Sequence, residues 1–195
     1  MKRITLAVSL NLFLAGVGTI QGVPTEEEKN YPEYVEQVFL TEAGALKSVF
    51  PVTTTVKKEI HTFTPAEKER IESKLGWILN EKAVTVYKGI GSDGKAQGFA
   101  VIAEEIGKFK PITFIVKAGM DGKVERVEVM VYREAVGSEV RRQRFARQFR
   151  GKSAKDPLRI NRDIINVTGA TMSVQAMTAG VKKALIILDE LYFKK

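Results

Sequence analysis

The chain has 195 residues, with 31 Lys and Arg against 23 Asp and Glu, a formal net charge of +8 at pH 7, one His and no Cys. That length suits one domain plus an export segment. Without Cys the chain has no disulfide, thiolate metal site or thioether-linked haem, and one His excludes a His-rich metal or haem site. No Ser-His-Asp or Cys-His arrangement is visible, so hydrolytic catalysis lacks support.

Residues 1–22 have the pattern of a signal segment. Lys2 and Arg3 precede a largely apolar run from Ile4 to Val17, and small residues suitable for cleavage follow. Because the apolar run is short for a membrane span, cleavage is the first interpretation and an uncleaved membrane anchor is the alternative. Both place the rest of the chain outside the cytoplasm.

The region from 23 to 82 is expected to be helical, after an acidic, polar linker at its start. Apolar residues recur at helical spacing from Tyr34 to Phe50, where Thr41 is a candidate cap and Pro51 a stop signal.

A second helix is predicted from Thr64-Pro65-Ala66-Glu67, which forms a capping box with Pro at the first helical position. It should run to Leu75, because Gly76 is a C-terminal helix signal.

Four strand patterns joined by short turns come next, and they predict an antiparallel meander. They cover residues 83–88, 96–104, 112–118 and 124–132. The last one alternates strictly, which predicts two distinct faces. One face would hold Val124, Arg126, Glu128 and Met130, and the other Val127, Val129 and Val131.

Beyond the strands we expect a helix over 137–149 with Ser138 as its N-cap, then a polar connection over 152–166. A long amphipathic helix over 172–193 should pack on the sheet. Its Met172 and Met177 are expected in the core. Its apolar stripe is Val174, Met177, Val181, Ala184, Leu185, Leu188 and Leu191. The sequence therefore predicts an α+β fold with short N-terminal helices, a four-stranded antiparallel meander and a long C-terminal helix.

The stretch Asn166-Val167-Thr168-Gly169-Ala170-Thr171-Met172-Ser173 lies directly before that long helix. A helix N-terminus presents unpaired N–H groups and the positive end of the helix dipole, which suits a phosphate. Gly169 and Ala170 let the backbone approach a bulky anion. Thr171 adds a hydroxyl, with Thr168 and Ser173 close by, so the stretch indicates a phosphate-bearing cofactor.

Thr168-Gly169-Ala170-Thr171 resembles the flavinylation motif, Ser or Thr followed by Gly-Ala-Thr, of the FMN-binding domain family. That family includes the small flavin subunits of sodium-pumping quinone reductases and of related electron-transport complexes. The resemblance implies FMN as cofactor, esterified through its phosphate to Thr171 by a separate, FAD-dependent FMN transferase. It covers residues 83–191, and residues 83–195 are the expected FMN-binding domain.

Three positions, in two elements, depart from the family pattern. Members often carry Asp six residues before the attachment Thr, where this chain has Ile165, so binding without the covalent link is the alternative. Glu134 and Gly137 match a family element, Glu-Thr-Pro-Gly, placed between the sheet and the flavin, while Ala135 and Val136 replace its Thr-Pro. Glu134 has the alternative roles of ion-pair partner of Arg133 or helix-capping carboxylate.

The most basic region runs from Arg133 to Arg162. One or two of its arginines could neutralise the FMN phosphate and stabilise reduced flavin. The same face could dock an acidic redox partner or anionic lipid headgroups, and a plain solvated surface is the simplest interpretation for most of it. Nucleic acid is not expected, because export argues against it and no recognised motif is present.

The sequence thus predicts an exported flavoprotein that shuttles electrons between redox partners or within a membrane electron-transport complex. One alternative is a noncovalent FMN-binding reductase. The other is a cofactor-free basic adaptor at the membrane surface.

Overall fold

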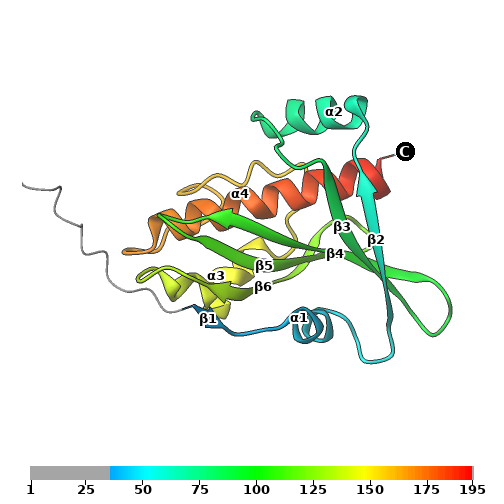
Figure 1. Cartoon of the computed structure of the whole chain (residues 1–195), viewed down its shortest axis with the longest axis horizontal. Helices are drawn as coiled ribbons and strands as arrows, with labels where there is room; N and C mark the ends of the chain where they lie inside the picture. Colours follow the sequence, from blue (N-terminus) through cyan, green and yellow to red (C-terminus); the bar gives the residue numbers. More distant parts are fainter. Residues whose placement is uncertain (1–35, 195) are drawn as a thin grey trace, which may run out of the picture. The chain divides into compact units, whose positions relative to one another are not determined.

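The structure, a computed structural model, describes residues 36–194, which belong to one compact unit (Figure 1). The predicted signal segment and the acidic linker lie outside the described residues. Within the described part of the chain, no helix is both long enough and apolar enough to span a membrane.

The described residues form one antiparallel sheet and helices on both of its faces. The strands, in the spatial order β1-β6-β5-β4-β3-β2, are β1 (Gln37–Val38), β2 (Thr55–Thr62), β3 (Ala83–Ile90), β4 (Ala96–Ile106), β5 (Pro111–Ala118) and β6 (Val124–Tyr132). The helices are α1 (Glu42–Val49), α2 (Pro65–Leu75), η1 (Ser138–Arg141), α3 (Gln143–Ala146), η2 (Arg147–Phe149), α4 (Thr171–Leu188) and η3 (Asp189–Phe193). The predicted α+β class is confirmed.

The sheet has six strands in the described residues, so the prediction of four was wrong. The predicted meander is present as β3 to β6, and strands from the N-terminal region extend it at both edges. β2 pairs with β3 from Thr55↔Ile90 to Thr62↔Ala83, and β1 pairs with β6 at Gln37↔Tyr132. Both added strands lie at edges and are largely exposed, so neither shows the apolar alternation that marks a buried strand. The region 23–82 is therefore helical only in part.

Both predicted N-terminal helix caps are present. The Thr41 hydroxyl accepts a hydrogen bond from the Gly44 N–H at 3.1 Å, and Thr64 and Glu67 form the full capping box. Gly76 ends α2 with φ +80°, a left-handed conformation that glycine adopts without strain. Local chemistry thus fixes these helix ends. α1 begins only at Glu42, so it is shorter than the apolar spacing from Tyr34 to Phe50 suggested.

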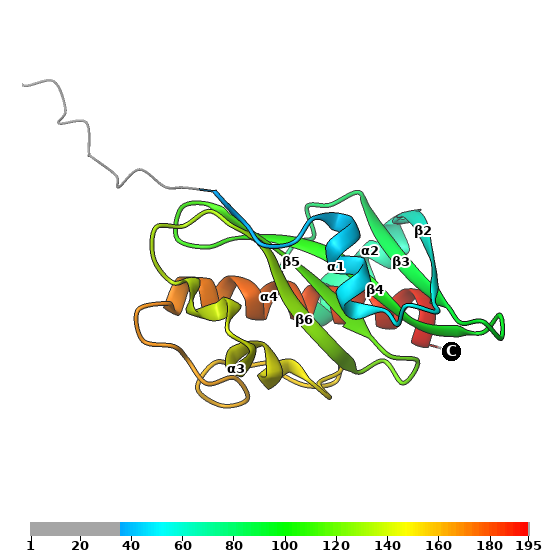
Figure 2. The ribbon, with the colours of Figure 1, turned by 90° about the horizontal axis from the view of Figure 1, so that it is seen from below.

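α4 and α1 cover opposite faces of the sheet (Figures 1 and 2). α4 packs along one face, where Met177 is fully buried, and Gly180 lets the helix approach so closely that a Cβ there would lie 2.5 Å from Phe114. On the other face α1 packs against a smaller cluster that includes Met130. Met172, in the first turn of α4, was expected in the core but is 44% exposed.

Two β-bulges in β6 change which side chains share a face. The pairing with β5 skips Glu125 and Met130, so each contributes one extra residue to the strand. As a result Val124, Val127, Val129 and Tyr132 all belong to the core under α4, whereas Val131 packs against the opposite cluster. The strict alternation expected from the sequence was therefore wrong at Val124 and Val131.

The segment after β6 does not form the single helix expected over 137–149. It is broken into η1, α3 and η2, and Arg142, between the first two, has the extended values φ −64° and ψ 136°. Ser138 makes no capping hydrogen bond, so that prediction was wrong. Only a few apolar side chains anchor the segment, among them Phe145 and Phe149 in edge-to-face contact at 5.5 Å.

The C-terminal turn η3 is held to α2 by ion pairs. Glu190, with a side chain 3% exposed, accepts hydrogen bonds from Arg70 at 2.5 Å and from Lys74 at 3.2 Å. Burial acts to raise the pKa of Glu190, but Arg70, Lys74 and Lys194 together outweigh it and lower the pKa from 4.5 to about 2.

This lowered pKa predicts acid-sensitive docking of η3. The ionised carboxylate favours the folded state at pH values above about 4.5, and its contribution is lost as the pH falls toward about 2. Glu190→Gln should therefore lower the unfolding midpoint at pH 7 and reduce its fall between pH 5 and pH 2.5. Thermal unfolding across this range measures both effects.

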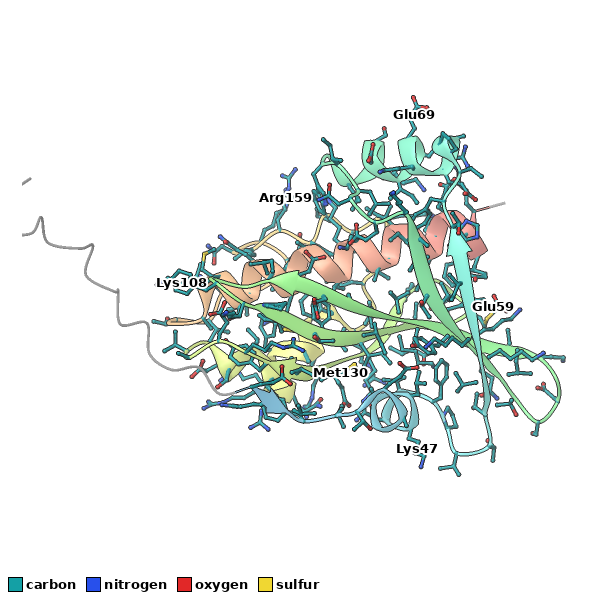
Figure 3. All side chains as sticks on the ribbon, in the orientation of Figure 1. Lys47, Glu59, Glu69, Lys108, Met130 and Arg159 are labelled. Carbon is teal, nitrogen blue, oxygen red and sulfur yellow. The ribbon has the colours of Figure 1, made fainter. Side chains whose placement is uncertain are left out.

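The matched control is Glu69→Gln on α2, the helix that carries Arg70 and Lys74. Glu69 is exposed, points away from the rest of the unit (Figure 3) and forms no ion pair within residues 36–194. An identical pH profile for Glu190→Gln and Glu69→Gln would contradict the assignment.

Candidate functional site

The loop before α4 is shaped to expose the start of that helix. Gly169 has φ +82°, with open space where a Cβ would lie, and Ala170 is the N-cap residue with φ −123°. The Ala170 N–H bonds the Val167 carbonyl at 3.0 Å, which closes the turn. No side chain caps the helix, so the N–H groups of its first turn are available to a ligand.

Thr171 is the first residue of α4 and is exposed. The Asn166 side-chain amide donates to the Thr171 hydroxyl oxygen at 3.2 Å, and its carbonyl oxygen accepts from the Val167 N–H at 2.9 Å. The amide group therefore fixes the hydroxyl relative to the loop. Thr168, three residues earlier in the same loop, is also exposed.

Ser173, unlike the two threonines, is buried and holds the helix to the end of β6. Its hydroxyl and that of Tyr132 lie 2.9 Å apart, and the Tyr132 hydroxyl donates to the Val136 carbonyl at 2.5 Å. Burial raises the pKa of Tyr132, and the carboxylates of Glu134 and Glu139 act in the same direction, so the phenol stays protonated as a donor. Sequence reasoning missed Tyr132, because alternation placed it on the wrong face of β6.

Gly137 brings the two sequence motifs together. It has φ +92°, and a Cβ there would lie 2.7 Å from the Ser173 hydroxyl, 2.8 Å from the Tyr132 hydroxyl and 3.4 Å from the Ala170 Cα. The loop that follows β6 therefore lies directly against the first turn of α4. This close approach requires glycine for both conformation and space.

Glu134 has a different role from either of those considered. Its carboxylate, on a residue 7% exposed, accepts from the backbone N–H groups of Phe109 at 2.6 Å and Lys110 at 3.0 Å. It thereby fastens the β4–β5 turn to the end of β6, beside Gly107, where a Cβ would lie 2.7 Å from the carboxylate. Arg133 instead pairs with Glu36. Glu134 thus holds the β4–β5 turn in place and makes no hydrogen bond to Thr171.

Gln148 is a second residue that the sequence did not reveal. Its side-chain amide donates to the Ile165 carbonyl at 3.2 Å and accepts from the Ile165 N–H at 2.6 Å. These two hydrogen bonds hold the backbone just before Asn166, while the Ile165 side chain remains 75% exposed. The 143–150 segment therefore supports the loop that carries Thr171.

The arrangement can hold a phosphate. It offers an exposed hydroxyl, a side-chain amide and open backbone N–H groups at the positive end of an 18-residue helix. Among residues 36–194, no group of three or more His, Cys, Asp or Glu side chains is placed to bind a metal ion.

Residues 107–186 match the model of the FMN-binding domain family. This part of the chain is an FMN-binding domain. The matched range runs from the β4–β5 turn through most of α4, so it contains Glu134, Gly137 and the loop that carries Thr171. FMN is accordingly the cofactor, and the phosphate-binding features above fit it.

A solved structure shares the fold. NqrC from Shewanella oneidensis aligns with a TM-score of 0.52 and 15% sequence identity, over 72% of this chain and 83% of that one. No curated protein is significantly similar to the chain.

The contact around Gly137 yields a stability prediction. Gly137→Ala combines a left-handed backbone with steric overlap, whereas Gly151→Ala has φ +78° with open space around the added Cβ. We expect Gly151→Ala to cost about 1 kcal/mol from conformation alone and Gly137→Ala about 2 kcal/mol more from overpacking. Urea unfolding of both variants measures the difference, and equal losses would contradict the close packing of the two motifs.

Proposed function

We propose that this protein is an electron-transfer flavoprotein that works outside the cytoplasm with FMN attached through its phosphate to Thr171. The observation that carries the proposal is the position of Thr171. Its exposed hydroxyl lies at the first residue of α4, in an FMN-binding domain, on a loop that leaves the helix N-terminus open.

Attachment requires a separate FMN transferase that uses FAD. The Thr171 oxygen forms a bond to the phosphorus atom on the flavin side of FAD. The pyrophosphate bond breaks, and the other half of FAD leaves as AMP. The hydroxyl proton passes to a base of the transferase or to water. Asn166 is a donor to the Thr171 oxygen at 3.2 Å, so it orients the hydroxyl without competing for its proton.

The chain's own residues hold the cofactor rather than carry the reaction. The helix dipole and the N–H groups of the first turn of α4 stabilise the phosphate charge. Tyr132 and Ser173 fix the angle of that turn against β6, and Glu134 fixes the neighbouring turn. Bound FMN supplies the electron-accepting ring.

Electron transfer between partners suits a tethered flavin, since a cofactor lost outside the cytoplasm is not easily replaced. The NqrC-like fold supports a place in a membrane electron-transport complex. With FMN as the cofactor, the cofactor-free adaptor is no longer an alternative.

The second candidate is a noncovalent FMN-binding reductase. It is favoured by Ile165, which stands where the resembled motif often has Asp and exposes an apolar side chain. A transferase that reads a carboxylate at this position would not modify the chain.

Intact mass measurement tests the covalent proposal. The full chain, co-expressed with an FMN transferase and exported, should gain the mass of one FMN less one water. Thr171→Ala should abolish the mass gain, because it removes the hydroxyl to which the phosphate would be attached. Thr168→Ala is the matched control, since Thr168 is exposed in the same loop, and it should retain at least half of the modification.

The outcomes separate the candidates. No mass gain in yellow protein would overturn covalent attachment and leave the noncovalent reductase. A gain that persists in Thr171→Ala and disappears in Thr168→Ala would move the attachment to Thr168.

Location is tested independently of the flavin. Cell fractionation of the full chain should find it outside the cytoplasm, with or without removal of residues 1–22. A chain retained in the cytoplasm would overturn this part of the proposal.

A further inference from the structure

A cavity of about 270 Å³ lies between the first half of β6 and the 143–150 segment. Its lining combines an apolar floor with polar walls that carry three guanidinium groups. The lining residues are Val124, Glu125, Arg126, Val127, Gln143, Ala146, Arg147 and Arg150. None of them belongs to the Thr171 loop or to the end of β6 that adjoins it.

The cavity exists because β6 is only partly covered along its outer edge. β1 pairs with β6 at Val131 and Tyr132 alone, and at the other end Val124 exchanges hydrogen bonds with Gly151 and Lys152. Between these two contacts no strand lies along the edge of β6 in the described residues. The 143–150 segment crosses this gap instead, and side chains from both elements face the space between them.

The charges facing the cavity are mostly positive and uncompensated. Arg147 and Arg150 are exposed and form no ion pair within residues 36–194. Arg126 pairs with Glu128, and the one carboxylate in the lining, Glu125, pairs with Lys117. Both nearby acids are thus already engaged, which leaves the two free guanidinium groups to attract an anion.

We propose that this cavity binds a small organic anion through phosphate or carboxylate groups held by Arg147 and Arg150. Guanidinium groups present paired N–H donors that match both kinds of oxyanion. The volume is just below the usual range for small-molecule pockets, about 300–1,000 Å³, so the ligand is a compact molecule with two or more acid groups. The buried side chains of Val127 and Ala146 contact its carbon skeleton.

This anion site is separate from the loop that carries Thr171. Val127 and Tyr132 are five residues apart on β6, and because the bulge at Met130 adds no length, this corresponds to about 14 Å along a strand. The site nevertheless shares a segment with the flavin loop, because Gln148, between the two arginines, holds the Ile165 backbone. The proposal does not depend on covalent attachment at Thr171.

Isothermal titration of the FMN-loaded full chain tests the proposal, with pyrophosphate and citrate as probes at constant ionic strength. We expect saturable binding of one anion per chain for at least one probe, and the tighter probe identifies the preferred acid group. Arg147→Gln with Arg150→Gln should weaken that binding at least tenfold. FMN content, measured by absorbance, should stay unchanged.

The chain offers a matched control on the same segment. Arg142 and Arg144 are also exposed and form no ion pair among residues 36–194, but neither lines the cavity. Arg142→Gln with Arg144→Gln removes the same charge and should change affinity less than twofold. An equal loss in both double variants would overturn the proposal in favour of diffuse surface attraction.

A charge-neutral variant tests the cavity itself. Gln143 is exposed at its wall, so Gln143→Trp should fill the space and also weaken binding at least tenfold. Unchanged affinity in Gln143→Trp would overturn the proposal. It would also be overturned if neither pyrophosphate nor citrate bound saturably to the unsubstituted protein.

Discussion

The packing of the first turn of α4 against the end of β6 determines the geometry of the loop that carries Thr171. Ser173, Tyr132 and Gly137 meet there in a contact with no room for a further methyl group. Breaking the hydrogen bond between two buried hydroxyl groups costs free energy, because both groups are then left unpaired. A tilt of α4 away from β6 would carry this cost. Thr171 lies two residues before Ser173, outside this contact, and is therefore exposed.

The same contact depends on an irregularity in the sheet. Without the bulge at Met130, Tyr132 would share a face with Met130 and point away from α4. The extra residue turns Tyr132 toward the core under the helix and aims its hydroxyl at Ser173. It also sends Val131 to the opposite face, where the cluster beneath α1 accepts it. One inserted residue therefore serves both sides of the sheet.

The loop that carries Thr171 is supported from outside the helix as well. Gln148 pairs with the Ile165 backbone and Asn166 contacts the Thr171 hydroxyl, so a continuous series of contacts runs from the broken 143–150 segment to the Thr171 hydroxyl oxygen. The break has a physical reason, since only four of residues 138–149 are apolar, which is too few to anchor a longer helix. Within residues 36–194 the arginines of the 143–150 segment form no ion pairs, which concentrates positive charge beside the open edge of β6.

The sequence by itself determined the features that local chemistry controls. The cap at Thr64, the glycine end at Gly76, the meander and the long final helix follow from propensity, turn chemistry and periodicity. The Thr168–Thr171 motif indicated FMN. Only the tertiary structure decided what long-range pairing controls. β1 and β2 gain their partners from distant strands, Tyr132 gains its direction from a bulge, and Glu134 finds backbone donors 24 and 25 residues away. Such contacts leave no periodic trace in the chain, because they depend on where separate elements meet.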